Sequence, residues 1–331
     1  MERVIDFWRD RHMLCPTCRH RWIVDLDWID RWEQAQEACP GCGLTCEHED
    51  APRVTVDPGD PALQDRRVAQ LDWYHTSTHQ DWPRRDFDPA AALDPETRAR
   101  MGGDHRVAAW AARQRAKALH VGTYESAIHN MLRRIRDQAD HGSQFHLYRV
   151  HLVPTVTVRQ DWVSDPSNWV GDVDLDTVCP PGVDIARYLN YHEDPGGLSL
   201  ALGRGAIACV QEVAIPMAEV GDANWIQDAV DTLNHAAKAK VSIARPTRGL
   251  GRLRPPPSPQ VIAARDLAKA LADRLPINLR WQFTSATAFA DGDDPVRWAR
   301  QTSGLRELIK DPAQVLAALD SQECRQVSLR G

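Results

Sequence analysis

The chain has 331 residues, of which 43% are hydrophobic and 26% are charged, and its formal net charge is −6. This composition is typical of a globular protein with two or three domains, and the acidic balance carries no overall signature of nucleic-acid binding. The first residues, MERVIDFWRD, are charged and lack the apolar run of a secretory signal or membrane span. We therefore expect a cytoplasmic protein that does not engage a membrane.

Residues 1–50 contain two Cys-x-x-Cys pairs: Cys15 with Cys18, and Cys39 with Cys42. A tight two-residue turn lets two thiolates converge on one ion, and two such turns complete a tetrahedron. The spacing therefore predicts a zinc ribbon-like module with a structural zinc ion bound by these four side chains. A site closed by four thiolates has no open coordination position, so the module by itself predicts no catalysis.

The other cysteines are sparse. Cys46 and His48 follow the second pair closely and are possible substitute ligands, although four thiolates complete the site without them. Cys179, Cys209 and Cys324 are scattered along the rest of the chain. Because most cysteines cluster in the zinc module, the pattern indicates metal binding rather than a disulfide framework, which fits a reducing compartment.

Beyond the module, a Pro- and Asp-rich linker is predicted over residues 51–66. The apolar spacing of Ile128, Met131, Leu132 and Ile135 predicts an amphipathic helix, with Thr123 as its N-cap. We expect helices over 105–118, 125–139 and 222–240, and strands over 71–74, 118–121, 145–153, 156–158, 198–202 and 207–215.

The C-terminal third begins with a Pro-rich basic linker over residues 245–259. Six basic residues and no acidic one occur between Lys238 and Arg254, a composition suited to contact with phosphate or a nucleic-acid backbone. A small α/β region is predicted over 260–331, with a helix at 261–275. A strand follows, in which Ile277, Leu279, Trp281 and Phe283 alternate along one face.

Two segments of the middle region resemble the ADP-ribosyltransferase superfamily. The first, residues 73–77 (WYHTS), is a strand that ends in His and small hydroxyl residues. The second, residues 119–127 (LHVGTYESA), is a strand, a turn and the start of a helix. Residues 147–152 are similar to the strand that follows in that superfamily, and residues 188–199 lead into a later strand. The resemblance covers about residues 70–215.

The resemblance implies an α+β domain over 67–244, built as an ADP-ribosyltransferase-like split β-sandwich with flanking helices and preceded by the zinc module. In that superfamily a first-strand His or Arg holds the nicotinamide ribose, a second-strand residue packs on the nicotinamide, and a late Glu orients the ribose. The catalytic residues that this implies here are His75, with Glu193 or Glu212. The implied NAD-binding residues are His75, Thr76, Ser77, His120, Gly122, Thr123 and Tyr124.

The choice between the two glutamates depends on local context. Glu193 precedes a strand in a Gly-rich turn that permits close approach of a ligand, and Glu212 lies within a strand beside Gln211. Glu193 is slightly preferred. The chain lacks a clean Glu-x-Glu or Gln-x-Glu pair and has His120 where many members have Tyr.

The chemistry needs few groups. Cleavage of the nicotinamide–ribose bond passes through an oxocarbenium-like transition state, and nicotinamide is already a good leaving group. The protein must hold the ribose firmly and place a carboxylate where positive charge develops. One His or hydroxyl group on the ribose diol and one Glu would suffice.

The sequence therefore favours an enzyme that transfers ADP-ribose from NAD to a macromolecular target, or that hydrolyses NAD. The zinc module would contribute to target recognition or steady the domain. The acceptor, protein or nucleic acid, stays open. The alternative is a non-enzymatic zinc-ribbon adaptor that binds nucleic acid or a protein partner on a degenerate transferase fold.

Overall fold

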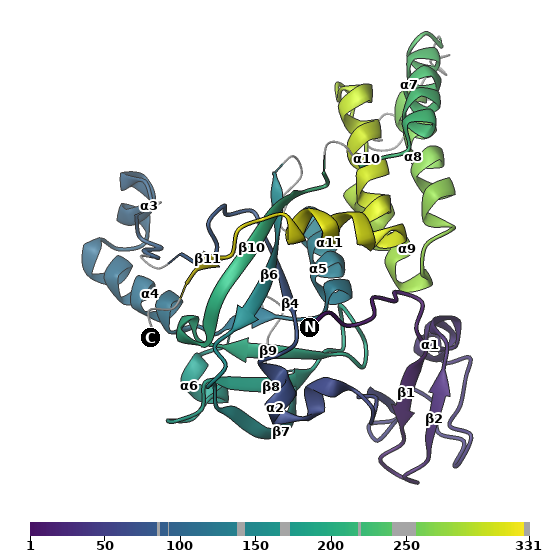
Figure 1. The fold of residues 1–331 in the computed structure, drawn as a ribbon. Coiled ribbons are helices and arrows are strands. Elements are labelled where there is room, and N and C mark those ends of the chain that lie inside the picture. Colours follow the sequence, from purple (N-terminus) through teal and green to yellow (C-terminus); the bar gives the residue numbers. More distant parts are fainter. Residues whose placement is uncertain are drawn as a thin grey trace. The chain divides into compact units, whose positions relative to one another are not determined.

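The computed structural model describes residues 1–84, 87–91, 93–137, 143–165, 173–217, 220–239 and 256–327. These residues form a mixed α/β protein with three sheets (Figure 1). The chain divides into two compact units. The first comprises Met1–Asn130, Phe145–Val213 and Ala318–Gly331, and the second comprises Met131–Gln144 and Ala214–Ala317.

A small antiparallel sheet carries the cysteine pairs. Its strands are β1 (Arg11–Leu14), β2 (Arg21–Val24) and β3 (Arg53–Thr55), in the order β2-β1-β3. Helix α1 (Leu26–Glu33) follows β2, and the Asp25 side chain caps it by accepting from the N–H of Trp28 at 2.7 Å.

The predicted linker over 51–66 is structured. It supplies β3, the short 3₁₀ helix η1 (Pro61–Leu63) and the start of α2 (Asp65–Val68). Strand β3 pairs with the edge of β1 opposite to β2. The backbone N–H and C=O groups of β3 thus hydrogen-bond those of β1 that β2 does not reach. This pairing is long-range in sequence and has no signature in local composition.

Two four-stranded sheets form the centre of the first unit. One has the order β11-β10-β6-β4, from β4 (Trp73–Ser77), β6 (Phe145–Leu152), β10 (Ile207–Ile215) and β11 (Arg325–Gln326). The other has the order β5-β9-β8-β7, from β5 (Leu119–Val121), β7 (Val158–Ser164), β8 (Ile185–Leu189) and β9 (Leu198–Leu202). Apolar side chains from both sheets, such as Trp73, Tyr148 and Leu200, share one core cluster.

Strands β4 and β5 belong to different sheets but meet at one point. The backbones of Tyr74 and Gly122 exchange two N–H···O bonds of 2.8 and 2.9 Å. Helix α5 (Tyr124–Asp137) begins directly after this bridge, and its first turn is capped by Thr123, whose Oγ1 accepts from the N–H of Ser126 at 3.0 Å. The N-cap predicted from the sequence is confirmed.

Short helices complete the first unit. They are α3 (Pro95–Arg100), α4 (Asp104–Ala116), α6 (Leu175–Val178) and the 3₁₀ helix η2 (Arg204–Ala206). Helix α4 ends three residues before β5 begins.

The second unit is helical. It contains α7 (Ala223–Ala237), α8 (Pro259–Ala272), α9 (Ile277–Ala286), α10 (Pro295–Lys310) and most of α11 (Pro312–Asp320). Helix α7, which the sequence places in the transferase-like domain, packs against α8 and α10 instead. Their shared core is lined by aliphatic and aromatic side chains such as Leu233, Ala268 and Trp298.

The strand predicted at 277–283 is wrong, because these residues lie in helix α9. Leu279 and Phe283 are buried, whereas Trp281 is 60% exposed and rests under the guanidinium of Arg136. The burial thus follows the four-residue spacing of a helix, and the alternate apolar residues that mimic a strand do not share one face. The basic stretch between Lys240 and Arg254 lies outside the described residues.

A disulfide joins Cys209 in β10 to Cys324 just before β11, with the sulfurs 2.09 Å apart. The expectation that the scattered cysteines form no disulfide is wrong for this pair, since β11 reaches β10 from 115 positions further along the chain. Cys179 is a buried free thiol. Among the helices of the described ranges, none combines the length and apolar character that crossing a membrane requires.

Candidate metal centre and candidate active site

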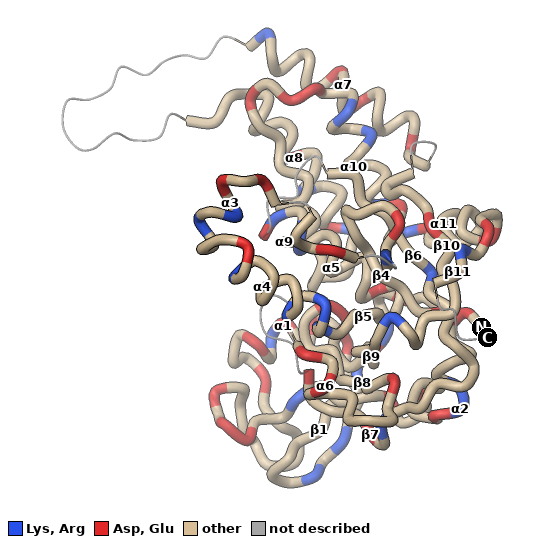
Figure 2. The backbone as a smooth tube through the Cα atoms, turned by 90° about the vertical axis from the view of Figure 1, so that its left-hand side faces the viewer, with Lys and Arg blue, Asp and Glu red and all other residues tan. Residues whose placement is uncertain are grey.

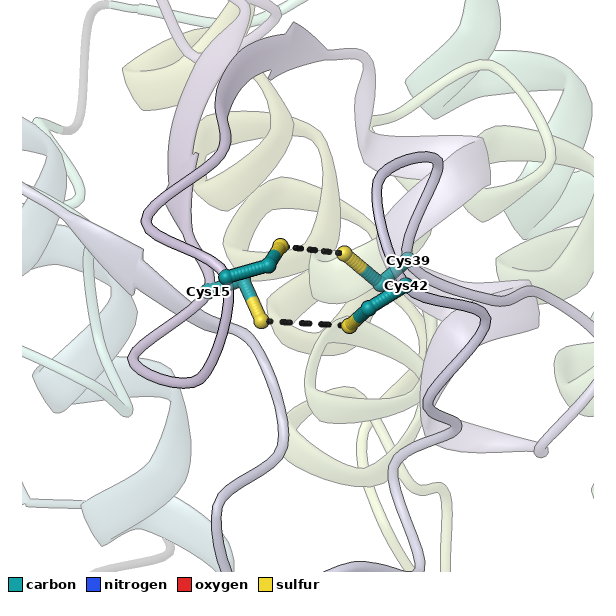
Figure 3. Close-up of side chains that lie close together, drawn as sticks. Cys15, Cys39 and Cys42 are labelled. Atoms are coloured by element: carbon teal, nitrogen blue, oxygen red, sulfur yellow. Dashed lines mark hydrogen bonds between the residues drawn. The ribbon is translucent and has the colours of Figure 1, made fainter.

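The four cysteines of the two Cys-x-x-Cys pairs converge on one point (Figure 3). Their sulfur atoms all lie within 4.8 Å of one another, with Cys15 to Cys42 and Cys18 to Cys39 each at 3.7 Å. A tetrahedron with sulfurs about 2.3 Å from a central zinc ion has edges of about 3.8 Å. The spacing therefore fits a metal ion such as zinc and far exceeds a disulfide bond of about 2.05 Å.

Both pairs adopt the same backbone turn. In each, the first cysteine donates its N–H to the carbonyl five residues on and accepts from the N–H four residues on, over 2.8 to 3.0 Å. The residue at that fourth position has a left-handed backbone: Arg19 with φ 60° and Gly43 with φ 76°. The two turns are thus structural equivalents, as a symmetric four-thiolate site requires.

Backbone N–H groups around the Cys15 sulfur favour its thiolate, whereas burial and the neighbouring thiols raise the pKa of the Cys18 and Cys42 thiols. Burial raises the pKa of the Cys15 thiol, but N–H groups of Cys18 and Thr17 donate to its sulfur, and the balance lowers the pKa to about 7. A Cβ atom at Gly41 would lie 2.9 Å from the Cys18 sulfur, so glycine leaves room for this ligand. Cys46 lies outside the cluster, where its thiol contacts the carbonyl of Glu33 at 3.9 Å. His48 is not part of the cluster either.

The zinc module is joined to the loop between β8 and β9 by a buried ionic cluster. Asp194 is 1% exposed, and its Oδ1 lies 2.5 Å from Arg9 and 3.5 Å from Arg11, while its Oδ2 accepts from the Thr123 hydroxyl at 2.8 Å. Burial, followed by the repulsion of Arg9, lowers the pKa of Arg11 to about 10. Arg9, which precedes β1, and Arg11, its first residue, therefore hold the loop that contains Glu193.

Glu125, in the first turn of α5, extends this cluster. It lies 3.7 Å from Arg9 and accepts the N–H of Asp6 at 2.8 Å. Burial and then the charge of Asp194 raise the pKa of the Glu125 carboxyl. The N-terminal segment is thus fastened at the start of α5 as well as at the β8–β9 loop.

His75 and His120 come together where β4 meets β5. The Nδ1–H of His75 donates to the backbone carbonyl of His120 at 2.9 Å, which places the proton on Nδ1 in the neutral ring. The His75 ring also stacks on Trp82, with centroids 3.9 Å apart. The His120 ring lies beside Tyr188, with Nδ1 3.1 Å from the hydroxyl.

The other nitrogen of His120 is distinctive. Its Nε2 is buried and has no hydrogen-bond partner among the described residues. Burial lowers the pKa of His120, and the nearby carboxylates of Asp165 and Glu193 oppose this shift. His120 is therefore a neutral ring at pH 7, with a polar atom that the described side chains leave unsatisfied.

Glu193 lies in the loop between β8 and β9. One of its carboxylate oxygens accepts from the Asn130 amide at 3.2 Å, and its backbone carbonyl accepts from the His129 ring at 2.6 Å. The Asn190 side chain accepts the N–H of Glu193 at 2.9 Å. Helix α5 and the loop thus position Glu193 on the side of His120.

Glu212 occupies a separate polar cluster on β10. It accepts from the Nδ1–H of His146 at 2.8 Å. Burial, and then the charge of Glu212, raise the pKa of Tyr148. Tyr148 is the cross-strand partner of His75, and its ring contacts Trp82 with centroids 5.3 Å apart. Glu212 is therefore linked to His75 through Tyr148 and Trp82.

Three further residues predicted to bind NAD lie on different faces: Ser77 and Thr76 on opposite faces of β4, and Tyr124 at the start of α5. Ser77 shares the His75 face, where its hydroxyl accepts from the N–H of His79 at 3.0 Å. Thr76 donates to the carbonyl of Ala127 in α5 at 3.1 Å, on the opposite face. Tyr124 is 1% exposed and packs edge-on against Tyr74 and Phe7, so it lies in the core beside α5.

Gly122 and Thr123 have structural roles: Gly122 allows close packing of two serine side chains, and Thr123 caps helix α5. A Cβ atom at Gly122 would lie 2.1 Å from the Ser126 hydroxyl and 2.8 Å from that of Ser199, so only glycine fits. The Thr123 hydroxyl is used by the α5 cap and by Asp194.

Several residues of this region have no sequence signal. Tyr188 lies 68 residues from His120 and Asp194 lies 185 residues from Arg9, the residues that they contact. Trp82 follows His75 by only seven residues, but no motif marks it as a ring partner. Asp194 directly follows Glu193 in a turn-forming Asp-Pro-Gly-Gly segment, where an aspartate would be expected on the surface. Only its tertiary partners distinguish it.

No family model, curated protein or solved structure matches the chain.

Proposed function

We propose that this chain cleaves the nicotinamide–ribose bond of NAD and transfers ADP-ribose to a macromolecular acceptor or to water. The observation that carries the proposal is the junction of β4 and β5. There the His75 ring donates to the His120 backbone, next to the Tyr74–Gly122 bridge. The two segments that resemble the ADP-ribosyltransferase superfamily are thus in contact, at the point where two four-stranded sheets meet.

In this proposal His75 holds the nicotinamide ribose. Its Nδ1 proton is committed to the His120 carbonyl, so the ring orientation is set before the substrate binds. A fixed ring lowers the entropic cost of placing the ribose for bond cleavage. The stacked Trp82 indole further restricts the His75 ring.

Glu193 is the preferred catalytic carboxylate. It lies near His120, whose buried Nε2 finds no partner in the described part of the chain and is the kind of group that a bound ligand completes. A carboxylate there would stabilise the positive charge that develops on the ribose as nicotinamide departs. Glu212 is the second candidate, since its link to His75 runs through Tyr148 and Trp82.

The zinc module has a supporting role in this proposal. Arg9 and Arg11 bind Asp194, the neighbour of Glu193, so an intact module steadies the loop that carries the proposed catalytic carboxylate. Residues 11–50 contain four arginines, no lysine and eight acidic residues, a balance that disfavours contact with nucleic acid through the module. A nucleic-acid acceptor would then be bound by surfaces outside the module, and the module itself would recognise only a protein acceptor.

The test is release of nicotinamide from NAD by the purified full-length chain, followed by chromatography. We expect release by the wild type, and at least a hundredfold loss in His75→Ala and Glu193→Gln, in line with the loss of one transition-state interaction. Retained zinc and an unchanged circular dichroism spectrum would show that the variants are folded.

Two controls sharpen the result. His235→Ala removes an exposed histidine of α7 and should leave release unchanged. Glu212→Gln should retain most of the activity if Glu193 is the catalytic carboxylate. Full activity in Glu193→Gln with loss in Glu212→Gln would reassign the carboxylate. Undiminished release in His75→Ala would overturn the proposed site.

A further inference from the structure

A basic helical hairpin stands out in this acidic chain. Helices α3 and α4, with the lysine that follows them, span residues 95–117 and contain six basic and two acidic residues, a net charge of +4. Figure 2 shows blue segments along both helices. The whole chain carries −6, so this hairpin is a local centre of positive potential.

Two arginines of the hairpin have no ionic or hydrogen-bonding partner among the described residues. Arg106 and Arg113 are exposed, and within the described part of the chain neither guanidinium has an ion pair or hydrogen bond. Other arginines of the hairpin are engaged: Arg98 binds Asp104 at 3.2 Å and Arg115 lies 3.6 Å from Asp88. Arg106 and Arg113 are seven residues apart, so they project from the same side of α4.

Between the two arginines is a hollow of about 410 Å³ lined by Met101, Arg106, Ala109, Trp110 and Arg113. Trp110 is half-buried, and among the described residues it stacks on no other ring. Several other tryptophans of the chain, such as Trp28 and Trp82, do have ring partners. The hollow therefore presents an aromatic surface flanked by two cations that no described residue pairs with.

The arrangement is costly for helix stability. Arg106 lies in the first turn of α4, where the helix dipole disfavours a positive charge. Its side chain passes over Gly102, where a Cβ atom would come within 2.6 Å of its Cδ. Arg106 therefore gains no stabilisation from the helix dipole, and Gly102 leaves room for its side chain over the preceding turn.

We propose that this hollow binds single-stranded nucleic acid. Unpaired arginines would contact phosphates on either side, and Trp110 would stack on an exposed base. In a duplex the base faces are stacked on one another and cannot stack on Trp110. An acidic peptide has no base that could stack on the indole. Stacking distinguishes a single strand from both.

Binding does not require NAD chemistry. A role of the single strand as acceptor of ADP-ribose, however, rests on the proposed function. Helix α4 leads within a few residues to β5, which contains His120. A bound strand would then lead toward the β4–β5 junction.

The experiment measures binding of the full-length chain to a fluorescein-labelled 20-nucleotide single-stranded DNA by anisotropy, over a range of NaCl concentrations. We expect Arg106→Glu and Arg113→Glu each to weaken binding about tenfold or more. Each should reduce the slope of log affinity against log salt by about 0.7, the value for one phosphate contact on a single strand. Trp110→Ala should weaken binding about tenfold without changing the slope.

The chain offers matched controls. Arg297 is exposed and lies at the third position of α10, as Arg106 does in α4, so Arg297→Glu makes the same charge change elsewhere. Trp281→Ala removes a tryptophan that is 60% exposed in α9. Neither should alter binding. Because Arg106 opposes the helix dipole, its replacement by Glu should leave the protein folded.

Other outcomes overturn the proposal. Unchanged affinity in Arg106→Glu or Arg113→Glu would show that the strand binds elsewhere, and unchanged affinity in Trp110→Ala would remove the stacking contact. Equal binding of a duplex, or displacement by polyglutamate as effective as by unlabelled strand, would make the surface a general polyanion site. These outcomes are independent of nicotinamide release, so failure of one proposal leaves the other in place.

Discussion

Asp194 shows how one residue ties together segments that are distant in sequence. Its carboxylate is buried between Arg9, Arg11 and Thr123, and Arg11 is itself only 3% exposed. A buried charge is tolerated when it is paired and hydrogen-bonded, and removal of one partner leaves the other uncompensated.

We predict that Asp194→Ala lowers the free energy of unfolding by about 3–5 kcal/mol, because Arg11 is left buried without its counter-ion. Urea denaturation followed by circular dichroism measures the loss. Asp228→Ala, on the exposed side of α7, should change stability by less than about 0.5 kcal/mol. A similar small effect of Asp194→Ala would contradict the buried ionic cluster.

His120 makes stability depend on pH. Burial lowers its pKa in the folded state below the unfolded value of about 6.5. A depressed folded-state pKa contributes stability that is present above the unfolded pKa and is lost as the pH falls through the folded one. The stability advantage of the wild type over His120→Asn should therefore be greatest above about pH 6.5 and decline toward pH 5.

Urea denaturation of both proteins at several pH values gives this difference directly. An advantage that stays constant or grows toward low pH would mean that His120 is not buried as a neutral ring. The His120→Asn variant also bears on the proposed function. That proposal relies in part on the His120 Nε2 atom, which no described residue satisfies.

At the level of elements, we expect the four-cysteine site and the sheet β2-β1-β3 to depend on each other. The strands have three or four residues each, and the first cysteine turn connects β1 to β2, while the second lies between α1 and β3. So short a sheet buries little apolar surface, and a bound metal compensates for this in small modules.

We predict one zinc ion per chain, lost in Cys39→Ser and on chelation. Without the metal, β1 should loosen and trypsin should cut after Arg9, Arg11 or Arg21, which the folded sheet protects. Elemental analysis and mass spectrometry of the tryptic fragments provide the measurements. Cys46→Ser is the matched control and should keep both its zinc and its resistance. Loss of zinc from that variant would bring Cys46 into the site.

For the whole molecule, the disulfide between Cys209 and Cys324 is a constraint of a different kind. It closes a loop of 115 positions, and the chain-entropy model assigns more stabilisation to longer loops. That loop includes almost the entire second unit, Ala214–Ala317.

We expect Cys324→Ser to lower the free energy of unfolding by about 2–4 kcal/mol in the absence of reductant. The wild type with reductant should unfold like the variant, while its zinc thiolates remain intact. Cys179→Ser, which removes a free thiol, is the comparison for loss of a cysteine without loss of a bond. Equal stability of wild type and Cys324→Ser would contradict the bond.

Charge also acts at the scale of the molecule. The net charge of −6 suggests no polyanion partner, yet the α3–α4 hairpin is basic and the zinc module is acidic. The net charge of the chain averages over these two oppositely charged regions. It therefore gives no sign of the basic α3–α4 hairpin, which is the proposed nucleic-acid contact.

Local features of the fold were predictable. The four-cysteine cluster follows from turn chemistry, since each Cys-x-x-Cys pair converges through its own backbone. Helix α5 and its Thr123 cap, and the strands β9 and β10, follow from apolar spacing within a few residues. Helix α9 did not, because its alternate apolar residues imitate a strand.

The sequence by itself determined the cysteine site, because every ligand pair is set by contacts within five residues. It also brought forward His75, His120 and the two glutamates as residues worth testing. Only the tertiary structure decided that β3 belongs to the zinc module, that β11 reaches β10 through a disulfide, and that Arg9 and Arg11 hold Asp194. These depend on partners at least 39 residues apart. Burial and charge compensation in the folded chain select such pairs, which leave no local pattern in the sequence.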